Sequence, residues 1–589
     1  MITLIHLTHE AWGKMGGIGA VLEGLLTSEA YQLVVDRTLL VGTAEIPLHA
    51  PPPDLANVVY ETGTSYLAPE SRESRLVEAF AALEETYGIR LFYGQRAMAA
   101  PLGGRRTLFD VLLLDVHHLY AGPVNQFKHD LYHAYGIEST RFEHDWGYEE
   151  WVRAALPALD AIRTYLGGRT DGAVLVSHEF MGLPTLLAAR IRLPDLKSVF
   201  WAHEVPPVRD LLEQQADHQL FFDGALRTSD GRRTYEALLQ EESTFKHALV
   251  SRAHVASRIF AVSDRIAAEL KLLGPKFSET PIDVVYNGLP ARPIDLETRL
   301  ASRHRVLDYT EHLFGFRPDF VFTHVTRPVV SKALERDLVV LRQMEPLLAA
   351  RGKRAVLLVL ATDGGRRDPD LICQMEAEYG WPVAHRVGWP DLVKGEVEFG
   401  LATQAYNEAA GATRAVLVNQ FGFGRPDCGN RVPAGLGFVD LRRGTDVEFG
   451  QSTYEPFGIS PLEVLAFGAL SVITRVSGCA QFIDRITKGR LPRNVLVAEY
   501  AAPVRNGPQA LAPEERRQIE EAVAASLARE LVERLPAAPA EFAELLDIGS
   551  RLAQRMGWQT VGCEFFLPAL SRCLGLALRT CPTEVPVLP

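Results

Sequence analysis

Short apolar runs alternate with helix-like segments along most of the chain. This alternation is typical of parallel sheets that are covered by helices on both faces. The strands predicted in the first half are residues 2–8, 36–42, 110–115, 173–177, 198–202, 259–262 and 282–286. Those predicted in the second half are residues 320–325, 355–361, 413–418, 470–474 and 494–497. The pattern therefore predicts an α/β protein with one sheet in each half.

Two stretches interrupt the alternation. Residues 290–320 contain Pro290, Pro293 and Pro318, which favours a connection between two domains followed by a lead-in to the next strand. Residues 419–450 are rich in glycine and are interpreted as a long loop or an insertion. Loops of this length are often functional, so this one is expected either to shape a binding cleft or to be an irrelevant insertion.

The length of 589 residues is too great for one ordinary domain and suggests two large ones. An N-terminal domain is predicted at residues 1–295 and a C-terminal domain at residues 296–538. A charged helix is expected at 513–535. A helical tail follows at 539–589, with continuous helix over 539–576.

Composition and charge narrow the class of function. Hydrophobic residues make up 47% of the chain and charged residues 23%, as in an ordinary globular protein. The net charge of −12 argues against non-specific binding to nucleic acid. No stretch approaches the roughly 20 apolar residues of a membrane span. The apolar run at residues 2–8 is too short for a cleavable export signal, so a cytoplasmic protein without a membrane partner is expected.

No metal site is indicated by the ligand-forming residues. The six cysteines are scattered and form no CxxC pair: Cys373, Cys428, Cys479, Cys563, Cys573 and Cys581. Neither a zinc site nor a disulfide framework is therefore indicated. An Asp-x-Asp metal clamp after a strand is also missing from the sequence. Cys479 is either reactive or, as we expect, a small packed residue.

Two glutamates eight positions apart, Glu455 and Glu463, are the most informative pair in the chain. They flank a Pro-Phe-Gly turn and the start of a helix-capable run, so both carboxylates can point to nearly the same side. Gly458, Ile459 and Ser460 would offer backbone N–H groups at the start of that helix. Carboxylates that accept from hydroxyls, beside amides that donate to oxygens, suit a polyhydroxylated and phosphorylated ligand. An ordinary loop-to-helix corner is the alternative.

A glycine-rich turn follows the first predicted strand. Lys14 precedes Gly16 and Gly17, and a helix is predicted directly afterwards. Strand, glycine turn and helix form a geometry that lets backbone approach a phosphate, and Lys14 adds a positive charge. The glycines do not form GxGxxG, so no dinucleotide fingerprint is supported. A plain turn that needs glycine for close packing is the alternative.

Two cations, Arg327 and Lys332, follow the strand predicted at 320–325. Arg offers planar multi-donor contacts and Lys a point charge, so the pair can grip a diphosphate. Solvated surface cations are the alternative.

These three segments resemble motifs of retaining glycosyltransferases that have two facing Rossmann-like domains, the GT-B fold. The version here looks most like the glycogen and starch synthases. YEPFGISPLE at 454–463 resembles their E-x7-E signature, KMGGI at 14–18 their K-x-G-G-[LI] motif, and RPVVSK at 327–332 their R-x4-K element. The family's lysine is usually followed by glycine, whereas Ala333 follows here.

Smaller matches occur in the same order along the chain. His178-Glu179-Phe180 resembles the HDW or HEW element, with phenylalanine in place of tryptophan. The strand that ends at His203 resembles the one whose terminal histidine lies beside the donor sugar. We interpret His178 as structural and His203 as functional.

The resemblance implies a GT-B fold with parallel sheets, a cleft between the two domains, and a tail that crosses back to the first domain. The N-terminal domain would be the acceptor side and the C-terminal domain the donor side. The implied reaction moves glucose from UDP- or ADP-glucose to a glucan acceptor with retention of configuration. The diphosphate would be neutralised by lysine and arginine, without a metal or another cofactor.

The residues implied by the resemblance fall into two groups. The catalytic group is Glu455, His203, Arg327 and Lys332. The donor-binding group is Lys14, Gly16, Gly17, Gly458, Ile459 and Glu463. In the family account Glu455 holds sugar hydroxyls and Glu463 reaches the nucleotide ribose.

Three other functions stay open. The same fold serves sucrose synthases and transferases to other small acceptors or lipids, and fold does not fix the acceptor. Sugar-nucleotide epimerases share it, although they are usually shorter. A non-catalytic glycan-binding relative is the third. For the donor, Pro461, Glu463 and Ile18 look more like the UDP-glucose branch, but ADP-glucose stays open.

Overall fold

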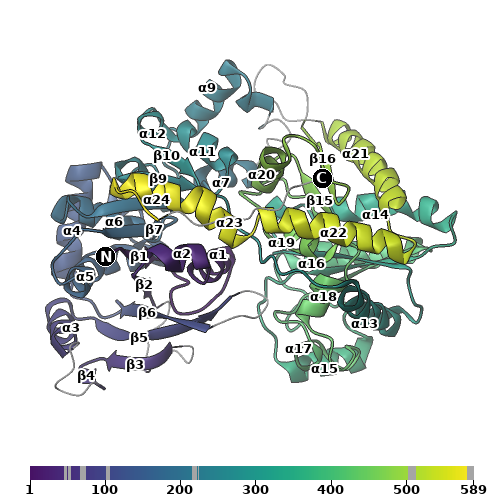
Figure 1. Ribbon diagram of the computed structural model, residues 1–589, viewed down its shortest axis with the longest axis horizontal. Coiled ribbons are helices and arrows are strands. Elements are labelled where there is room, and N and C mark those ends of the chain that lie inside the picture. The colour runs from purple at the N-terminus through teal and green to yellow at the C-terminus, as the bar shows by residue number, and fades with distance from the viewer. Residues whose placement is uncertain are drawn as a thin grey trace. The chain divides into compact units, whose positions relative to one another are not determined.

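The structure is a computed structural model that describes residues 1–44, 50, 55–66, 74–100, 106–214, 222, 224–501 and 512–579. The chain divides into two compact units (Figure 1). Among the described residues, unit 1 contains Met1–Val208, Tyr235–Gly288 and the segment from Trp558 to Arg579, and unit 2 contains Arg209–Thr234 and Leu289–Gly557. The sequence placed the corresponding boundaries at residues 295 and 539.

Within the described residues, unit 1 contains a ten-stranded sheet in the order β10-β9-β8-β7-β1-β2-β6-β5-β3-β4. Its strands are β1 (Thr3–Leu7), β2 (Arg37–Thr43), β3 (Leu55–Glu61), β4 (Thr64–Ser65), β5 (Arg90–Ala99), β6 (Arg106–Asp115), β7 (Ala173–His178), β8 (Lys197–Ala202), β9 (Arg258–Ala261) and β10 (Ile282–Val284). Neighbours from β10 to β6 are parallel, whereas β5, β3 and β4 pair antiparallel. Every strand predicted in the first half is confirmed. The three antiparallel strands were missed because polar and half-exposed residues interrupt their apolar pattern.

The helices of unit 1 are α1 (Gly17–Leu26), α2 (Glu29–Val34), α3 (Ser74–Tyr87), α4 (Ala121–Tyr135), α5 (Trp146–Tyr165), α6 (Leu183–Arg192), α10 (Phe245–Val250), α11 (Asp264–Leu270), α12 (Lys276–Glu279), α23 (Trp558–Val561) and α24 (Leu567–Leu574). Two more, α7 (Pro206–Gln214) and α9 (Ser229–Leu238), extend from one unit into the other. The helices of unit 1 cover both faces of its sheet (Figure 1).

The C-terminal segment of unit 1 is anchored by aromatic side chains. The indole of Trp558 fills the space beside Gly24 and Gly288, where an added Cβ would lie 1.9 and 2.5 Å from it. The ring of Phe566 stacks on Trp201 with 5.8 Å between centroids. The single helix predicted over 539–576 is wrong, because α22 (Pro539–Arg555) ends before Gly557 and a π-turn separates α23 from α24. Residues 580–589 of the predicted tail lie outside the described residues.

Unit 2 contains, among its described residues, a six-stranded sheet in the order β13-β12-β11-β14-β15-β16. Its strands are β11 (Phe320–Val325), β12 (Ala355–Leu360), β13 (Thr413–Val418), β14 (Val447–Gly450), β15 (Leu470–Thr474) and β16 (Val495–Ala498). All neighbours are parallel. Counted along the chain, this order is 3-2-1-4-5-6, the strand order of a Rossmann domain. The five strands predicted in this half are confirmed.

The helices of unit 2 are α13 (Leu296–Phe314), α14 (Glu335–Ala349), α15 (Pro369–Tyr379), α16 (Glu396–Ala409), α17 (Arg425–Cys428), α18 (Phe438–Gly444), α19 (Ser460–Glu463), α20 (Gly478–Thr487), α21 (Pro513–Arg534) and α22. Alternate residues of the strands enter different cores because successive side chains of a strand point to opposite faces. Phe322 joins a core that includes residues of α14, α16 and α21, and Val321 joins one that includes residues of α13, α15 and α18. Each such buried side chain stabilises the fold by roughly 1.5–3 kcal/mol.

Two sequence predictions for unit 2 need correction. The connection expected at 290–320 does begin at the boundary between the units, after Gly288, but most of it is α13, which Asp295 caps by accepting from the Thr298 N–H at 2.7 Å. The prolines of this stretch lie outside that helix. The supposed loop at 419–450 contains the central strand β14, which was missed because Glu448 interrupts a very short apolar run. The carboxylate of Glu448 is fully buried, accepts from the Val325 N–H at 2.9 Å, and pairs with Arg442 at 2.9 Å.

The sequence indicated no disulfide framework, and one described cysteine departs from that expectation. Among the described residues Cys373, Cys428, Cys479 and Cys573 are free. Cys563, in contrast, is disulfide-bonded, which the spacing of the cysteines along the chain did not indicate. Cys581 lies outside the described residues.

The described helices include none with the length and apolar character that a membrane span requires.

Candidate functional site

In unit 2 the predicted residues gather where the strand order reverses. The chain reaches β12 and β13 on one side of β11, and β15 and β16 on the far side of β14. Open α/β sheets bind ligands at the carboxyl ends of the strands at this switch point. Arg327 and Lys332 follow β11, and Glu455 follows β14. The topology therefore places both predicted motifs at the expected position.

Lys332 and Glu455 form an ion pair although they are 123 residues apart. The Lys332 Nζ donates to the Glu455 Oε2 at 2.5 Å, and the Ser452 Oγ donates to the same oxygen at 3.2 Å. The two charged side chains are each 16% exposed, so water screens them only partly. Ser331 fixes the two loops together, because its carbonyl accepts from the Thr453 N–H at 2.8 Å.

Arg327 is exposed at the end of β11. Within the described chain its guanidinium has no hydrogen bond or ion pair, so its donors face solvent. Ala333, which follows Lys332, has a φ of +45°. This left-handed conformation favours glycine, so the backbone here still has the shape that a glycine would adopt most easily.

The turn after Glu455 brings Gly458 against the glutamate side chain. Gly458 has a φ of +93°, and a Cβ added there would lie 3.0 Å from the Glu455 Cγ. Among the described residues, the amide N–H groups of Gly458 and Ile459 have no hydrogen-bond acceptor. The helix that follows is shorter than expected, because α19 ends at Glu463 and a 3₁₀ turn continues to Phe467.

Glu463 lies beside a buried ion-pair network. Its carboxylate is 3.4 Å from the Arg442 guanidinium, which also pairs with the buried Glu448. The side chain of Glu463 is 27% exposed. It is therefore held in place by Arg442 and still reaches solvent.

Cys479, which packs near this corner, is fully buried, and burial raises the pKa of its thiol to about 12. The prediction of a packed cysteine is confirmed.

In unit 1 the turn that contains Gly16 is held by the buried carboxylate of Glu10. The Glu10 side chain is buried and accepts from the N–H groups of Met15 at 2.7 Å and Gly16 at 2.6 Å. The Gly16 N–H thus already has an acceptor. Gly17 is the first residue of α1, and a Cβ added to it would have no atom within 4 Å. Lys14 is half-exposed and pairs with Glu23 at 2.9 Å. The sequence analysis did not single out Glu10, whose acidic side chain just before a glycine turn was the available signal.

His203 follows β8 at the carboxyl edge of the unit 1 sheet, and His178 ends the neighbouring strand β7. The His178 Nδ1 is 2.9 Å from the His203 Nε2. Burial lowers the pKa of His203 to about 3, and the charge of His9 adds to this, so the ring is neutral at ordinary pH. The Glu179 carboxylate accepts from the backbone N–H groups of His203 and Glu204, which orients the loop that carries His203.

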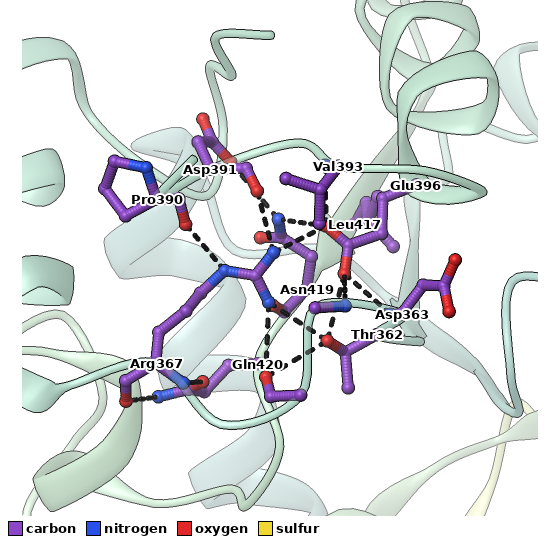
Figure 2. Close-up of polar contacts among 12 residues, drawn as sticks. Thr362, Asp363, Arg367, Pro390, Asp391, Val393, Glu396, Leu417, Asn419 and Gln420 are labelled. Atoms are coloured by element: carbon purple, nitrogen blue, oxygen red, sulfur yellow. Dashed lines mark hydrogen bonds and ion pairs between the residues drawn. The ribbon is translucent and has the colours of Figure 1, made fainter. Parts of the chain in front are cut away.

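A buried arginine organises the loops that follow β12 and β13 in unit 2 (Figure 2). Arg367 is fully buried and donates to the Glu396 carboxylate at 2.6 Å and to the carbonyls of Pro390 and Asp391 at 2.6 and 2.7 Å. Glu396 also accepts from the Gly364 N–H at 2.9 Å. Because these bonds satisfy both charges, the network gives this edge of the sheet a fixed shape.

The same network holds an aromatic side chain that the sequence analysis missed. Trp389 is 61% exposed and lies next to Pro390, whose carbonyl Arg367 binds. The loop then passes close to the β11 segment, because a Cβ added to Gly395 would lie 2.1 Å from the Pro328 carbonyl oxygen. Pro328 directly follows Arg327. An exposed indole on this loop suits stacking on a planar ring, and a tryptophan in a Gly-Trp-Pro turn was the available signal.

Two solved structures are similar to the whole chain. The catalytic domain of starch synthase IV from Arabidopsis thaliana, bound to ADP and acarbose, has a TM-score of 0.52 at 12% identity and covers 98% of this chain and 99% of that one. A structure described as trehalose-6-phosphate from E. coli, bound with UDP-2-fluoro glucose, has a TM-score of 0.50 at 11% identity and covers 98% of this chain and 100% of that one. Both neighbours are GT-B proteins. The chain has the GT-B fold. No protein-family model and no curated protein sequence matches it.

Unit 1 also contains a cavity at the opposite edge of its sheet from His178 and His203. That cavity has a volume of about 880 Å³ and is lined in part by Arg252, His254 and Phe277. These residues precede β9 and β10, so the cavity lies at the amino edge of the sheet, opposite His178 and His203. Across the described residues, no group of three or more His, Cys, Asp or Glu side chains is arranged to hold a metal ion.

Proposed function

We propose that this chain is a retaining glycosyltransferase that moves glucose from UDP- or ADP-glucose to a glucan in the cytoplasm. The observation that carries the proposal is the Lys332–Glu455 pair at the switch point of the Rossmann-ordered sheet. One cation and one carboxylate at this position match the two parts of a sugar nucleotide, because the diphosphate is anionic and the sugar offers hydroxyl donors.

The leaving group is assigned to Lys332 and Arg327. As the bond between the sugar C1 and the diphosphate oxygen breaks, negative charge grows on the diphosphate, and preorganised cations stabilise it. Lys332 is already held in position by Glu455, whereas Arg327 is exposed and can approach a phosphate. This charge neutralisation is the basis for proposing a reaction that needs no metal.

The sugar is assigned to Glu455 with the amides of Gly458 and Ile459, and the ribose to Glu463. Trp389 adds a surface on which the nucleobase would stack, an assignment that follows from its exposure on the loop beside Pro328.

From unit 1, the family resemblance assigns His203, Lys14, Gly16 and Gly17 to the donor. For Gly16 the contribution would be through the shape of the turn, because its N–H donates to Glu10.

In the reaction implied by the resemblance, the acceptor oxygen forms its bond to C1 on the face from which the diphosphate leaves. The acceptor proton passes to an oxygen of that diphosphate, and configuration is retained. No carboxylate then has to act as a nucleophile, which agrees with the pairing of Glu455 to Lys332.

A small acceptor is the second candidate. The similar starch synthase structure is bound to acarbose, which supports a glucan, whereas the other similar structure is described as trehalose-6-phosphate. The two structures have nearly equal TM-scores, so they support both acceptor classes.

Calorimetric titration and turnover together test the proposal. UDP and ADP are titrated into the protein, and release of the diphosphate from UDP-glucose and ADP-glucose is followed with glycogen, glucose or glucose 6-phosphate as acceptor. The proposal expects binding of one nucleotide and turnover with glycogen. Turnover only with a small sugar would replace the glucan, binding without turnover would indicate a non-catalytic relative, and no binding would refute the proposal.

A further inference from the structure

A line of hydrogen bonds runs through the interior of unit 1 and ends at His203. The Thr38 Oγ1 is 2.8 Å from the Tyr31 hydroxyl, which is 3.3 Å from the His6 Nε2. The His6 Nδ1 is 2.9 Å from the His178 Nε2, and the His178 Nδ1 is 2.9 Å from the His203 Nε2. We call these five residues the histidine relay. All but His203 are buried.

The histidines of the relay are neutral. Burial lowers the pKa of His6 to about 3 and moves that of His178 well below its ordinary value. A neutral imidazole has one N–H donor and one bare nitrogen, so each ring in the line must donate on one side and accept on the other. The relay can therefore point in only two directions, and all three rings must share the same tautomer.

The direction decides what His203 offers at its outer nitrogen. If the hydrogen bonds point inward, the His203 Nε2–H donates to His178 and the His203 Nδ1 is a bare acceptor. If they point outward, His178 donates to the His203 Nε2, and the Nδ1 carries the hydrogen. Within the described residues the His203 Nδ1 has no partner, so this atom is the one that a ligand would meet.

The inner end of the relay selects one direction. In the inward arrangement Tyr31 donates to Thr38, and the Thr38 hydroxyl hydrogen then needs another acceptor. Among the described residues Tyr31 is the only hydrogen-bond partner of the Thr38 side chain. A buried donor without an acceptor costs roughly 1–3 kcal/mol, whereas the outward arrangement gives every buried donor of the relay an acceptor and leaves only the Nδ1–H of the partly exposed His203 for a ligand.

We propose that Tyr31, His6 and His178 are positioning residues that hold His203 as its Nδ1–H tautomer. His203 then donates a hydrogen bond to a ligand oxygen and cannot act as a base. If the proposed function holds, this oxygen belongs to a hydroxyl of the donor sugar. The rings of Trp201 and His203 stack with 5.7 Å between centroids, which fixes the plane in which the hydrogen is presented.

The tautomers are measured directly by ¹⁵N NMR of the full chain with ¹⁵N-labelled histidine, because an N–H nitrogen and a bare nitrogen have different chemical shifts. Single substitutions of His6, His178 and His203 assign the signals. The proposal expects all three rings as Nδ1–H, the form that free histidine disfavours. An Nε2–H signal from His203 would overturn it, and this wild-type measurement is decisive even if a variant fails to fold.

Tyr31→Phe tests whether the relay sets the tautomer. Without the hydroxyl, an Nε2–H on His6 would be a buried donor that faces a phenyl ring, so the outward arrangement stays favoured and His203 should keep its Nδ1–H. Tyr148→Phe is the matched control, since Tyr148 is also buried in unit 1 and its hydroxyl is 2.7 Å from the Ser139 Oγ. Thr38→Val keeps the Tyr31 hydroxyl, so it should leave His203 unchanged.

A His203 that switches to the Nε2–H form in Tyr31→Phe or in Thr38→Val would refute the relay, because in both variants the inward arrangement leaves a buried donor without an acceptor. The spectra need no substrate. A chain with the expected tautomers and no turnover would therefore refute the proposed function and leave the relay intact.

Discussion

Glu455→Gln separates the role of the sugar-binding carboxylate from its role in folding. Glutamine keeps the size of the side chain and removes the charge that Lys332 faces at 2.5 Å. The gross attraction at that distance is roughly 7 kcal/mol at an effective dielectric constant of about 20. Desolvation of both charges offsets most of this, and the amide oxygen can still accept, so we expect the free energy of unfolding to fall by only about 1–2 kcal/mol.

Turnover should respond much more strongly than stability. Loss of a group that stabilises the transition state typically lowers kcat by about 10²–10³-fold. Binding of free UDP or ADP should tighten by about 3- to 10-fold, because Lys332 no longer shares its charge with a carboxylate. Denaturant titration, donor turnover and calorimetry measure the three quantities. Glu544→Gln, which removes an exposed carboxylate paired with Arg493 at 2.8 Å in the same unit, is the control and should change none of them.

Turnover at saturating donor that is unchanged in Glu455→Gln would refute the assignment of the sugar to this residue. Weaker binding of the free nucleotide would show that Glu455 contacts the nucleotide and not the sugar.

Three further predictions concern unit 2. Arg327→Ala should lower kcat at least 10-fold and leave the melting temperature unchanged, because the side chain is exposed; equal turnover would exclude it from the site. Ala333→Gly should raise the free energy of unfolding by about 0.5–1 kcal/mol, because relief of the left-handed strain exceeds the entropy that glycine adds to the unfolded chain; denaturant titration showing a loss would contradict this. Burial tends to raise the pKa of Glu396, but bonds such as that from the Gly364 N–H, and the charge of Arg367, lower it below the ordinary value. The stabilisation from the Glu396 charge is therefore present above about pH 4.3 and lost as the pH falls through the pKa of the folded state. Glu396→Gln should accordingly have a lower free energy of unfolding than wild type at pH 7, and the difference between the two proteins should shrink in acid. Denaturant titrations at several pH values measure this difference.

The strands that could be predicted from the sequence are those with uninterrupted apolar runs, such as β1 and β12. β14 escaped prediction because it is short and contains Glu448, whose charge is compensated by residues that are distant in the sequence. Compensation of that kind is a property of the tertiary fold, and a local pattern does not contain it.

In the candidate site, too, the sequence located residues but not the contacts between them. The motif resemblance located Lys332 and Glu455, but their ion pair became visible only when the loops after β11 and β14 were placed side by side. His6 was counted as one residue of an apolar strand, and its contact with His178 depends on the pairing of β1 with β7.

The most direct test of the central claim is the configuration of the product. The chain is incubated with UDP-glucose or ADP-glucose and a glycogen primer in excess EDTA, and the new linkage is examined by NMR. The account predicts that α-linked glucose is added, that configuration is retained, and that EDTA does not stop the reaction. An inverted linkage, or activity that returns only when Mg²⁺ or Mn²⁺ is restored, would contradict it.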